Sequence, residues 1–269
     1  MSENGPFRFS QSSLSAYAQC RRRFWLRYVR RIQWPAPLSQ EMDLWERAVE
    51  RGALFHHWMH QDGIGVDVDA WAQEHEDELL VRWWRNWRQT PAPQPAGQVL
   101  SEVQLSVPLL SHRLLAQFDR IVVAEGGGIW IGDWKTGQCI PAVRDLADSW
   151  QTWVYRYVAL EASAVLSGER GVRPEDIVLV YWHANAPAAL EPISYSAPQH
   201  DEARSKIERA IAEIEGLPRQ EDAFPMTENR RECRRCRYAS LCQRAEGKSE
   251  VLDVEDEERA WSEVPDDQW

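Results

Sequence analysis

The sequence predicts an α/β fold in which a largely helical N-terminal part precedes a sheet. Three stretches in the first third of the chain have helical signals: residues 10–28, 41–61 and 69–89. Strand-like apolar runs follow at residues 99–108, 115–123, 129–135 and 177–182, with a weaker one around Ile193. Further helices are expected at residues 145–166 and 198–217, so helices and strands alternate in the second half.

The first helix is predicted by a serine-rich start and an apolar stripe. Ser10, Ser12 and Ser13 are N-cap candidates, and apolar residues then recur at helical spacing at Leu14, Tyr17, Phe24 and Tyr28. Six arginines fall within residues 21–31: Arg21, Arg22, Arg23, Arg27, Arg30 and Arg31. Such a run is usually a solvated face, but in so acidic a chain we expect it to face an anion such as a phosphate backbone.

The chain of 269 residues carries a net charge of −11, and most of that charge lies at one end. Residues 249–269 hold nine acidic residues and one arginine, a net charge of −8. We expect residues 1–248 to form one domain and residues 249–269 to be an acidic tail, disordered or bound to a partner. No apolar run reaches ~18 residues and no signal peptide is visible, so we expect no membrane association and a cytoplasmic setting.

The central motif is Asp133-Trp134-Lys135 at the end of the apolar run 129–135. In an extended segment Asp133 and Lys135 point to one face and Trp134 to the other. A carboxylate can bind a hard divalent cation, and a nearby ammonium can stabilise charge on a phosphate. Taken alone, this pattern is more often a surface salt pair at a strand end.

Other polar residues raise the significance of this motif. A glycine turn at residues 126–128 predicts a hairpin that sets Asp119 beside Asp133, and a bound cation would relieve the repulsion between these two acids. His56 lies on the second helix. Gln151 and Tyr155 are four residues apart, hence on one face of a later helix.

Four cysteines form a second candidate site. Cys233, Cys236 and Cys242 have close spacing near the end of the predicted domain, and Cys20 lies on the first helix. Four thiolates can ligate a 4Fe-4S cluster or a zinc ion, whereas disulfides are disfavoured in a reducing compartment. Cys139 is left over and is expected to be a spare thiol.

Together these motifs resemble the PD-(D/E)XK nuclease superfamily, and within it the RecB-like group. The matching pieces occur in the family's order: Gly52-x-x-x-His56, Asp119-Arg120-Ile121, Asp133-x-Lys135 and Gln151-x-x-x-Tyr155. The resemblance covers most of residues 10–245. It implies a restriction-endonuclease-like core, with a central mixed sheet flanked by helices, a helical N-terminal part and a C-terminal Fe–S staple.

The resemblance also implies roles for the site residues. His56, Asp119, Asp133 and the backbone carbonyl of Trp134 would bind Mg²⁺ or Mn²⁺, and the mixed His and carboxylate set favours Mn²⁺ somewhat. Lys135 would orient water or stabilise the transition state, while Gln151 and Tyr155 would position the reacting groups. Glu102, on the first strand, either supports this site or faces solvent, and the sequence favours neither.

The cysteine pattern resembles the Fe–S subgroup of RecB-like nucleases, including AddB-type subunits and CRISPR-adaptation nucleases. This resemblance favours a 4Fe-4S cluster over zinc, with Cys20, Cys233, Cys236 and Cys242 joining the two ends of the domain. The cluster would also bring arginines of the C-terminal segment to the first helix as a DNA-binding surface: Arg21, Arg22, Arg23, Arg27, Arg234 and Arg235.

The resemblance implies a metal-dependent deoxyribonuclease, an exonuclease on single-stranded or end-opened DNA, in DNA repair and recombination or in CRISPR adaptation. Expected protein partners are a helicase or a CRISPR integrase-type protein. The chain has no P-loop motif, so it carries no ATPase of that class itself. The alternative is a non-catalytic DNA-binding or scaffold module of such a complex.

Overall fold

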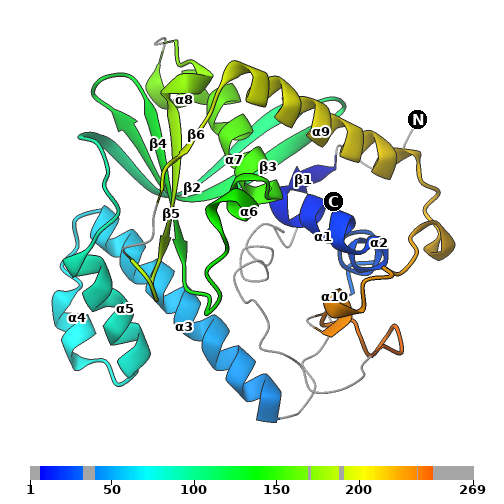
Figure 1. The fold of residues 1–269 in the computed structure, drawn as a ribbon, viewed down its shortest axis with the longest axis horizontal. Helices are drawn as coiled ribbons and strands as arrows, with labels where there is room; N and C mark the ends of the chain where they lie inside the picture. The colour runs from blue at the N-terminus through cyan, green and yellow to red at the C-terminus, as the bar shows by residue number, and fades with distance from the viewer. Residues whose placement is uncertain (1–6, 33–39, 169–170, 188–190, 235, 245–269) are drawn as a thin grey trace.

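A mixed β-sheet forms the centre of the computed structural model, which describes residues 7–32, 40–168, 171–187, 191–234 and 236–244 (Figure 1). Within these residues the sheet has six strands in the order β1-β3-β4-β5-β6, with β2 paired to the other edge of β3. The strands are β1 Arg8–Ser10, β2 Gly97–Leu109, β3 His112–Ala124, β4 Ile129–Lys135, β5 Ile177–His183 and β6 Ile193–Ser194. The predicted acidic tail and Arg235 lie outside the described residues.

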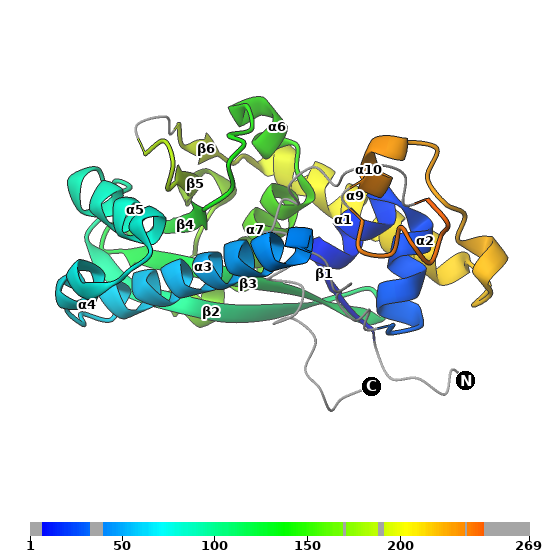
Figure 2. The same ribbon diagram turned by 90° about the horizontal axis from the view of Figure 1, so that it is seen from below.

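Helices cover both faces of the sheet, which confirms the predicted α/β fold. They are α1 Gln11–Gln19, α2 Arg21–Phe24, a π-helical turn Trp25–Val29, α3 Gln40–Gly63, α4 Asp69–Glu74, α5 Glu78–Gln89, α6 Val143–Ala147, α7 Trp150–Glu161, α8 Ser163–Ser167, α9 Ala197–Gly216 and α10 Arg230–Arg234. Figure 2 shows α3 running along β2 and β3, with α4 and α5 at one end and α1, α2 and α10 at the other. None of the described helices has the length and apolar character needed to cross a membrane.

Three predicted helices are interrupted, and polar side chains explain two of the breaks. Asp77 caps α5 by accepting hydrogen bonds from the backbone N–H groups of Leu79 and Leu80, which ends the predicted helix 69–89 after α4. Ser149 caps α7 in the same way and divides the predicted helix 145–166. The predicted helix 10–28 breaks at Cys20, whose backbone is extended.

Each face of the sheet has its own apolar core. On one face, α1, α7 and α9 pack against residues such as Phe118 and Ile131. On the other face, side chains of α3 and α5 pack together with side chains of β4 and β5. This cluster is rich in tryptophan: Trp58, Trp83, Trp84, Trp87, Trp130, Trp134 and Trp182. Because all seven are buried, these indoles stabilise the fold and are not available to stack on a ligand.

The edge of β3 opposite β2 contains a gap, and this gap creates the site. There β1 pairs with residues 113–115 and β4 pairs with residues 120–123, so residues 116–119 face neither strand. The hydroxyl of Tyr155 on α7 donates to the carbonyl of Gln117 (2.5 Å), and the carboxylate of Asp119 accepts from the N–H of Trp134 (2.7 Å). Side chains therefore satisfy backbone groups where the strands separate.

Gly132 is required by the two indoles beside it on β4. A Cβ at this position would lie 2.5 Å from the ring of Trp130 and 2.8 Å from the ring of Trp134. Since both rings are buried and cannot move aside, Gly132→Ala should lower the free energy of unfolding by about 1–3 kcal/mol. Denaturant unfolding measures this, with Gly126→Ala as the control because no atom lies near its added Cβ. Equal stability of the two variants would contradict the packing argument.

Candidate active site and cysteine pocket

Three potential metal ligands converge at the gap in the sheet. His56 on α3, Glu102 on β2 and Asp119 on β3 each offer one ligand atom, and these atoms lie within 4.8 Å of one another. The Nδ1 of His56 is 3.3 Å from Oδ1 of Asp119, whose side chain is buried. One imidazole nitrogen and two carboxylate oxygens suit Mn²⁺ or Mg²⁺, so the residues fit the predicted divalent cation.

Glu102 reaches this site through an unusual backbone conformation. Its φ is +51°, in the left-handed region, although Ser101 and Val103 on either side pair regularly with Arg120 and Phe118. This conformation costs a non-glycine residue about 1–2 kcal/mol. The side-chain amide of Gln117 donates a hydrogen bond to the carboxylate of Glu102 (3.2 Å). Glu102 is therefore half-buried and lies beside His56 and Asp119.

Asp133, Lys135 and Gln151 form a ring closed by one ion pair and two hydrogen bonds beside these ligands. Nζ of Lys135 lies 3.1 Å from Oδ1 of Asp133 and donates to Oε1 of Gln151 (2.9 Å). The amide nitrogen of Gln151 donates to Oδ2 of Asp133 (2.9 Å). Asp133 is fully buried and lies outside the set of three close ligand atoms. The structure thus places the predicted lysine, aspartate and glutamine in contact.

The register of the hairpin explains why the two predicted acids are near each other. Pairing between β3 and β4 ends at Arg120 and Gly132, so Asp119 and Asp133 occupy the next opposed positions. The N–H of Trp134 points towards Asp119, while the carbonyl of Lys135 accepts from Ala184 on the β5 side. Since N–H and C=O of one strand residue face the same side, the carbonyl of Trp134 faces β3 and the ligand set.

The structure buries Tyr155 in the core, whereas the sequence predicts that this residue positions the reacting groups. Its side chain is fully buried, its ring packs against Phe118 (centroids 4.7 Å apart), and its hydroxyl donates a hydrogen bond to the carbonyl of Gln117.

The ring of Tyr181 faces Lys135, whose Nζ lies 5.5 Å from the ring centre. Burial raises the pKa of Tyr181 to about 12, so this phenol stays neutral at physiological pH.

Arg120 holds α3 against the sheet one turn beyond His56. Its buried guanidinium donates to the carbonyl of Met59 (2.8 Å) and lies 3.7 Å from the carboxylate of Asp62. The indoles of Trp87 and Trp134 enclose it, at 5.5 Å and 5.2 Å from its central carbon. Burial lowers the pKa of Arg120, and Asp62 and Asp119 oppose that effect. The sequence motifs predict no role for this residue.

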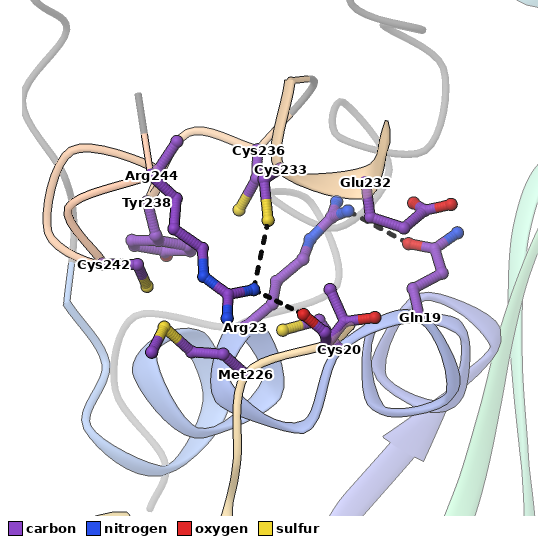
Figure 3. Close-up of a pocket in the computed structure, with 12 residues that line it drawn as sticks. Gln19, Cys20, Arg23, Met226, Glu232, Cys233, Cys236, Tyr238, Cys242 and Arg244 are labelled. Carbon is purple, nitrogen blue, oxygen red and sulfur yellow. Dashed lines mark hydrogen bonds between the residues drawn. The ribbon is translucent and has the colours of Figure 1, made fainter. Parts of the chain in front are cut away.

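All four predicted cysteine ligands line one pocket. Cys20 comes from the break between α1 and α2, Cys233 from α10, and Cys236 and Cys242 from the turns that follow (Figure 3). The extended backbone of Cys20 separates α1 from α2 at the pocket. Cys139 is exposed and does not line the pocket. The two ends of the described chain therefore meet at these thiols.

No three sulfur atoms of the described cysteines lie within 4.8 Å of one another. Among the described residues, only His56, Glu102 and Asp119 bring three ligand atoms within 4.8 Å of one another. Ligands of a tetrahedral zinc at Zn–S distances of about 2.3 Å would lie closer together than that. Burial raises the pKa of Cys236 to about 11, so ligation at this thiol must release a proton.

The predicted DNA-binding arginines are partly engaged within the protein. Arg21 pairs with Glu213 on α9, and Arg22 pairs with Glu221 and donates to the carbonyl of Phe224 (2.8 Å). Arg23 donates to Gln19 (3.0 Å) and lines the cysteine pocket, whereas Arg27 lies over the ring of Tyr28. Arg234 is exposed on α10. The basic run therefore anchors C-terminal segments to the N-terminal helices.

Comparison with known proteins supports the family indicated by these motifs. The family model of the PD-(D/E)XK nuclease superfamily matches residues 8–243. A crystal structure from Eubacterium rectale, provisionally assigned as an exonuclease, shares 12% identity and a TM-score of 0.53, covering 92% of this chain and 91% of that one. The structure of SSO0001 shares 12% identity over 90% and 87% of the two chains, with a TM-score of 0.40. No curated protein matches the chain. Because the family model spans most of the sequence and the fold has the mixed central sheet of a restriction-endonuclease-like core, the chain belongs to the PD-(D/E)XK nuclease superfamily.

Proposed function

We propose that this protein is a metal-dependent deoxyribonuclease of the RecB-like group that hydrolyses phosphodiester bonds. The observation that carries the proposal is the placement of His56, Glu102 and Asp119 within 4.8 Å of one another, next to the ring of Asp133, Lys135 and Gln151. A binding or scaffold module needs neither feature. The two together are what phosphodiester hydrolysis requires.

The proposed metal ligands are His56, Glu102 and Asp119, with Asp133 and the carbonyl of Trp134 as further oxygen ligands from β4. A bound divalent cation supplies Lewis-acid stabilisation of negative charge on the phosphate. Glu102 was open as a ligand from the sequence, and its inclusion rests on its closeness to His56 and Asp119.

Lys135 is the proposed catalytic residue that contacts the scissile phosphate or the attacking water. Its ammonium is held between Asp133 and Gln151, so it needs little reorganisation when charge develops on the phosphate. Gln151 orients Lys135, because its side-chain amide accepts a hydrogen bond from Lys135 and donates one to Asp133. Tyr155 acts indirectly. Its hydroxyl holds the backbone carbonyl of Gln117, and the side-chain amide of Gln117 donates a hydrogen bond to the carboxylate of Glu102.

The four cysteines are proposed to bind a structural 4Fe-4S cluster, as in the Fe–S subgroup of RecB-like nucleases. Support comes from the pocket that all four cysteines line. A reducing, cytoplasmic setting would keep the thiols available for ligation. The cluster would fix Cys20 to the C-terminal segment, and the exposed Arg234 nearby would approach the DNA backbone.

The nuclease proposal is tested by metal titration on an end-labelled single strand. Cleavage should appear as Mn²⁺ or Mg²⁺ is added, disappear with a chelator, and shorten the strand from one end. Glu102→Gln keeps the shape of the side chain but removes a charged ligand, so half-maximal cleavage should need roughly 10-fold or more metal. Calorimetric titration of Mn²⁺ without DNA should show the same weakening of binding.

Gln104→Ala is the matched control, because Gln104 is exposed on the same strand. It should leave the metal requirement unchanged. Cleavage that persists unaltered in excess chelator would exclude a metal-dependent mechanism. Unchanged Mn²⁺ affinity in Glu102→Gln would remove Glu102 from the ligand set while leaving the nuclease assignment standing.

A further inference from the structure

We propose that the positive charge of Arg244, in the cysteine pocket, offsets the negative charge of the bound cluster. Arg244 thereby raises the reduction potential of the cluster. This inference rests on the iron–sulfur part of the proposed function. It assigns a role to an arginine that belongs to none of the motifs described above.

The contacts of Arg244 place its guanidinium among the thiols. Its NH1 group donates to Sγ of Cys233 (3.7 Å) and to the carbonyl of Thr227. It lines the same pocket as Cys20, Cys236 and Cys242. Figure 3 shows this side chain reaching from the end of the described segment into the group of cysteine sulfurs. Arg244 therefore contacts one of the four proposed ligands and shares the pocket with the other three.

The backbone conformation of the preceding residue turns the side chain of Arg244 towards the cysteine pocket. Gln243, between Cys242 and Arg244, has a φ of +54°, which is unfavourable for a residue with a side chain. The N–H of Arg244 then donates to the carbonyl of Ala239 (2.8 Å), so the chain turns back over the pocket. Strained residues of this kind persist where the surroundings require them, and they are concentrated at functional sites.

The charge balance of a cluster explains why an arginine is useful here. A 4Fe-4S cubane with four thiolate ligands is a dianion when oxidised and gains another negative charge on reduction. Arg244 and Arg23, which also lines the pocket, bring two positive charges to it, and Glu232 brings one negative charge, so the lining is net positive. Hydrogen bonds to the sulfurs and nearby positive charge both stabilise the reduced form more than the oxidised form, and so raise the reduction potential.

The test compares Arg244→Gln, Arg244→Lys and wild type after anaerobic purification, using redox titration of the visible spectrum together with iron and sulfide analysis. Arg244→Gln should have a lower midpoint potential than wild type and lose its cluster to a chelator roughly tenfold faster. Arg244→Lys keeps the charge and should lie between the two. Arg230→Gln is the control, since it removes an exposed arginine of the same segment, and should match wild type.

Each outcome decides the proposal. A loaded Arg244→Gln protein with the potential and cluster lifetime of wild type would overturn it. If Arg244→Gln holds no iron while Arg244→Lys does, the charge is needed for assembly and the proposal is supported. If both variants lose the cluster equally, shape and not charge is required, and the proposal is wrong. If wild type itself contains no iron, the cluster proposal fails, whereas the nuclease proposal is decided separately by metal-dependent cleavage.

Discussion

Lys135→Ala is expected to lower the rate of DNA cleavage by roughly 10²–10³-fold or more, because it removes a preorganised positive charge from the phosphate site. The ammonium contacts Asp133 and Gln151, and the hydrogen bond between these two partners remains in the variant to hold β4 and α7 together. DNA binding should survive, since one lysine contributes little to the contact with the DNA backbone. Single-turnover cleavage of a labelled strand measures the rate, and fluorescence anisotropy measures the binding.

Lys206→Ala is the matched control for this prediction. Lys206 is also paired with an aspartate, Asp148, but lies on the surface of α9. Its loss should leave cleavage within a factor of about two of wild type, since surface ion pairs contribute little. Asp133→Ala should be as inactive as Lys135→Ala. If purified, folded Asp133→Ala or Lys135→Ala cut DNA at the wild-type rate, the assigned site would be wrong.

Cys233→Ala is expected to abolish cluster binding and to destabilise the joined ends of the domain. Metal binding to such sites contributes folding free energy, and it closes a loop of more than 200 residues between Cys20 and Cys233. The variant should be colourless, contain no iron and unfold at a markedly lower temperature than wild type. Limited proteolysis should cut its C-terminal segment first, because the cluster no longer holds it.

Cys139→Ser controls for the loss of a thiol, since Cys139 is exposed and outside the pocket. It should retain the iron content, colour and melting temperature of wild type. Metal analysis of the wild-type protein also separates the two ligation chemistries. Zinc without iron or sulfide would overturn the Fe–S assignment even if Cys233→Ala lost the metal. Full iron content in Cys233→Ala would remove this cysteine from the ligand set.

Sequence reasoning identified the parts of the site that depend on local periodicity. The glycine turn and the lengths of the two runs set Asp119 opposite Asp133, and the structure gives that register. Helical spacing put Gln151 and Tyr155 on one face of a helix, and the structure brings Gln151 into contact with Asp133 and Lys135. These positions follow from short segments whose geometry is fixed by the repeat of a strand or a helix.

Features that depend on contacts between distant segments were missed or left open. Strand β1 has three residues and gains its identity only by pairing with β3 about a hundred positions later. Glu102 shares a register position with Asp119, but its left-handed backbone breaks the alternation on which a strand prediction relies. DNA binding by Arg21 and Arg22 stays a prediction, and their acidic partners on α9 and in the following segment could be found only from the fold.

The way β1 and Cys20 find their partners constrains the order in which the chain can assemble. Strand β1 is made before the other described strands, yet it pairs with residues 113–115, and Cys20 can share a pocket with all three later cysteines only after residue 242 has been made. Contacts of such long sequence separation form slowly because loop closure must precede them. Strand β1 and Cys20 should therefore dock late during synthesis, after the sheet that receives them has formed.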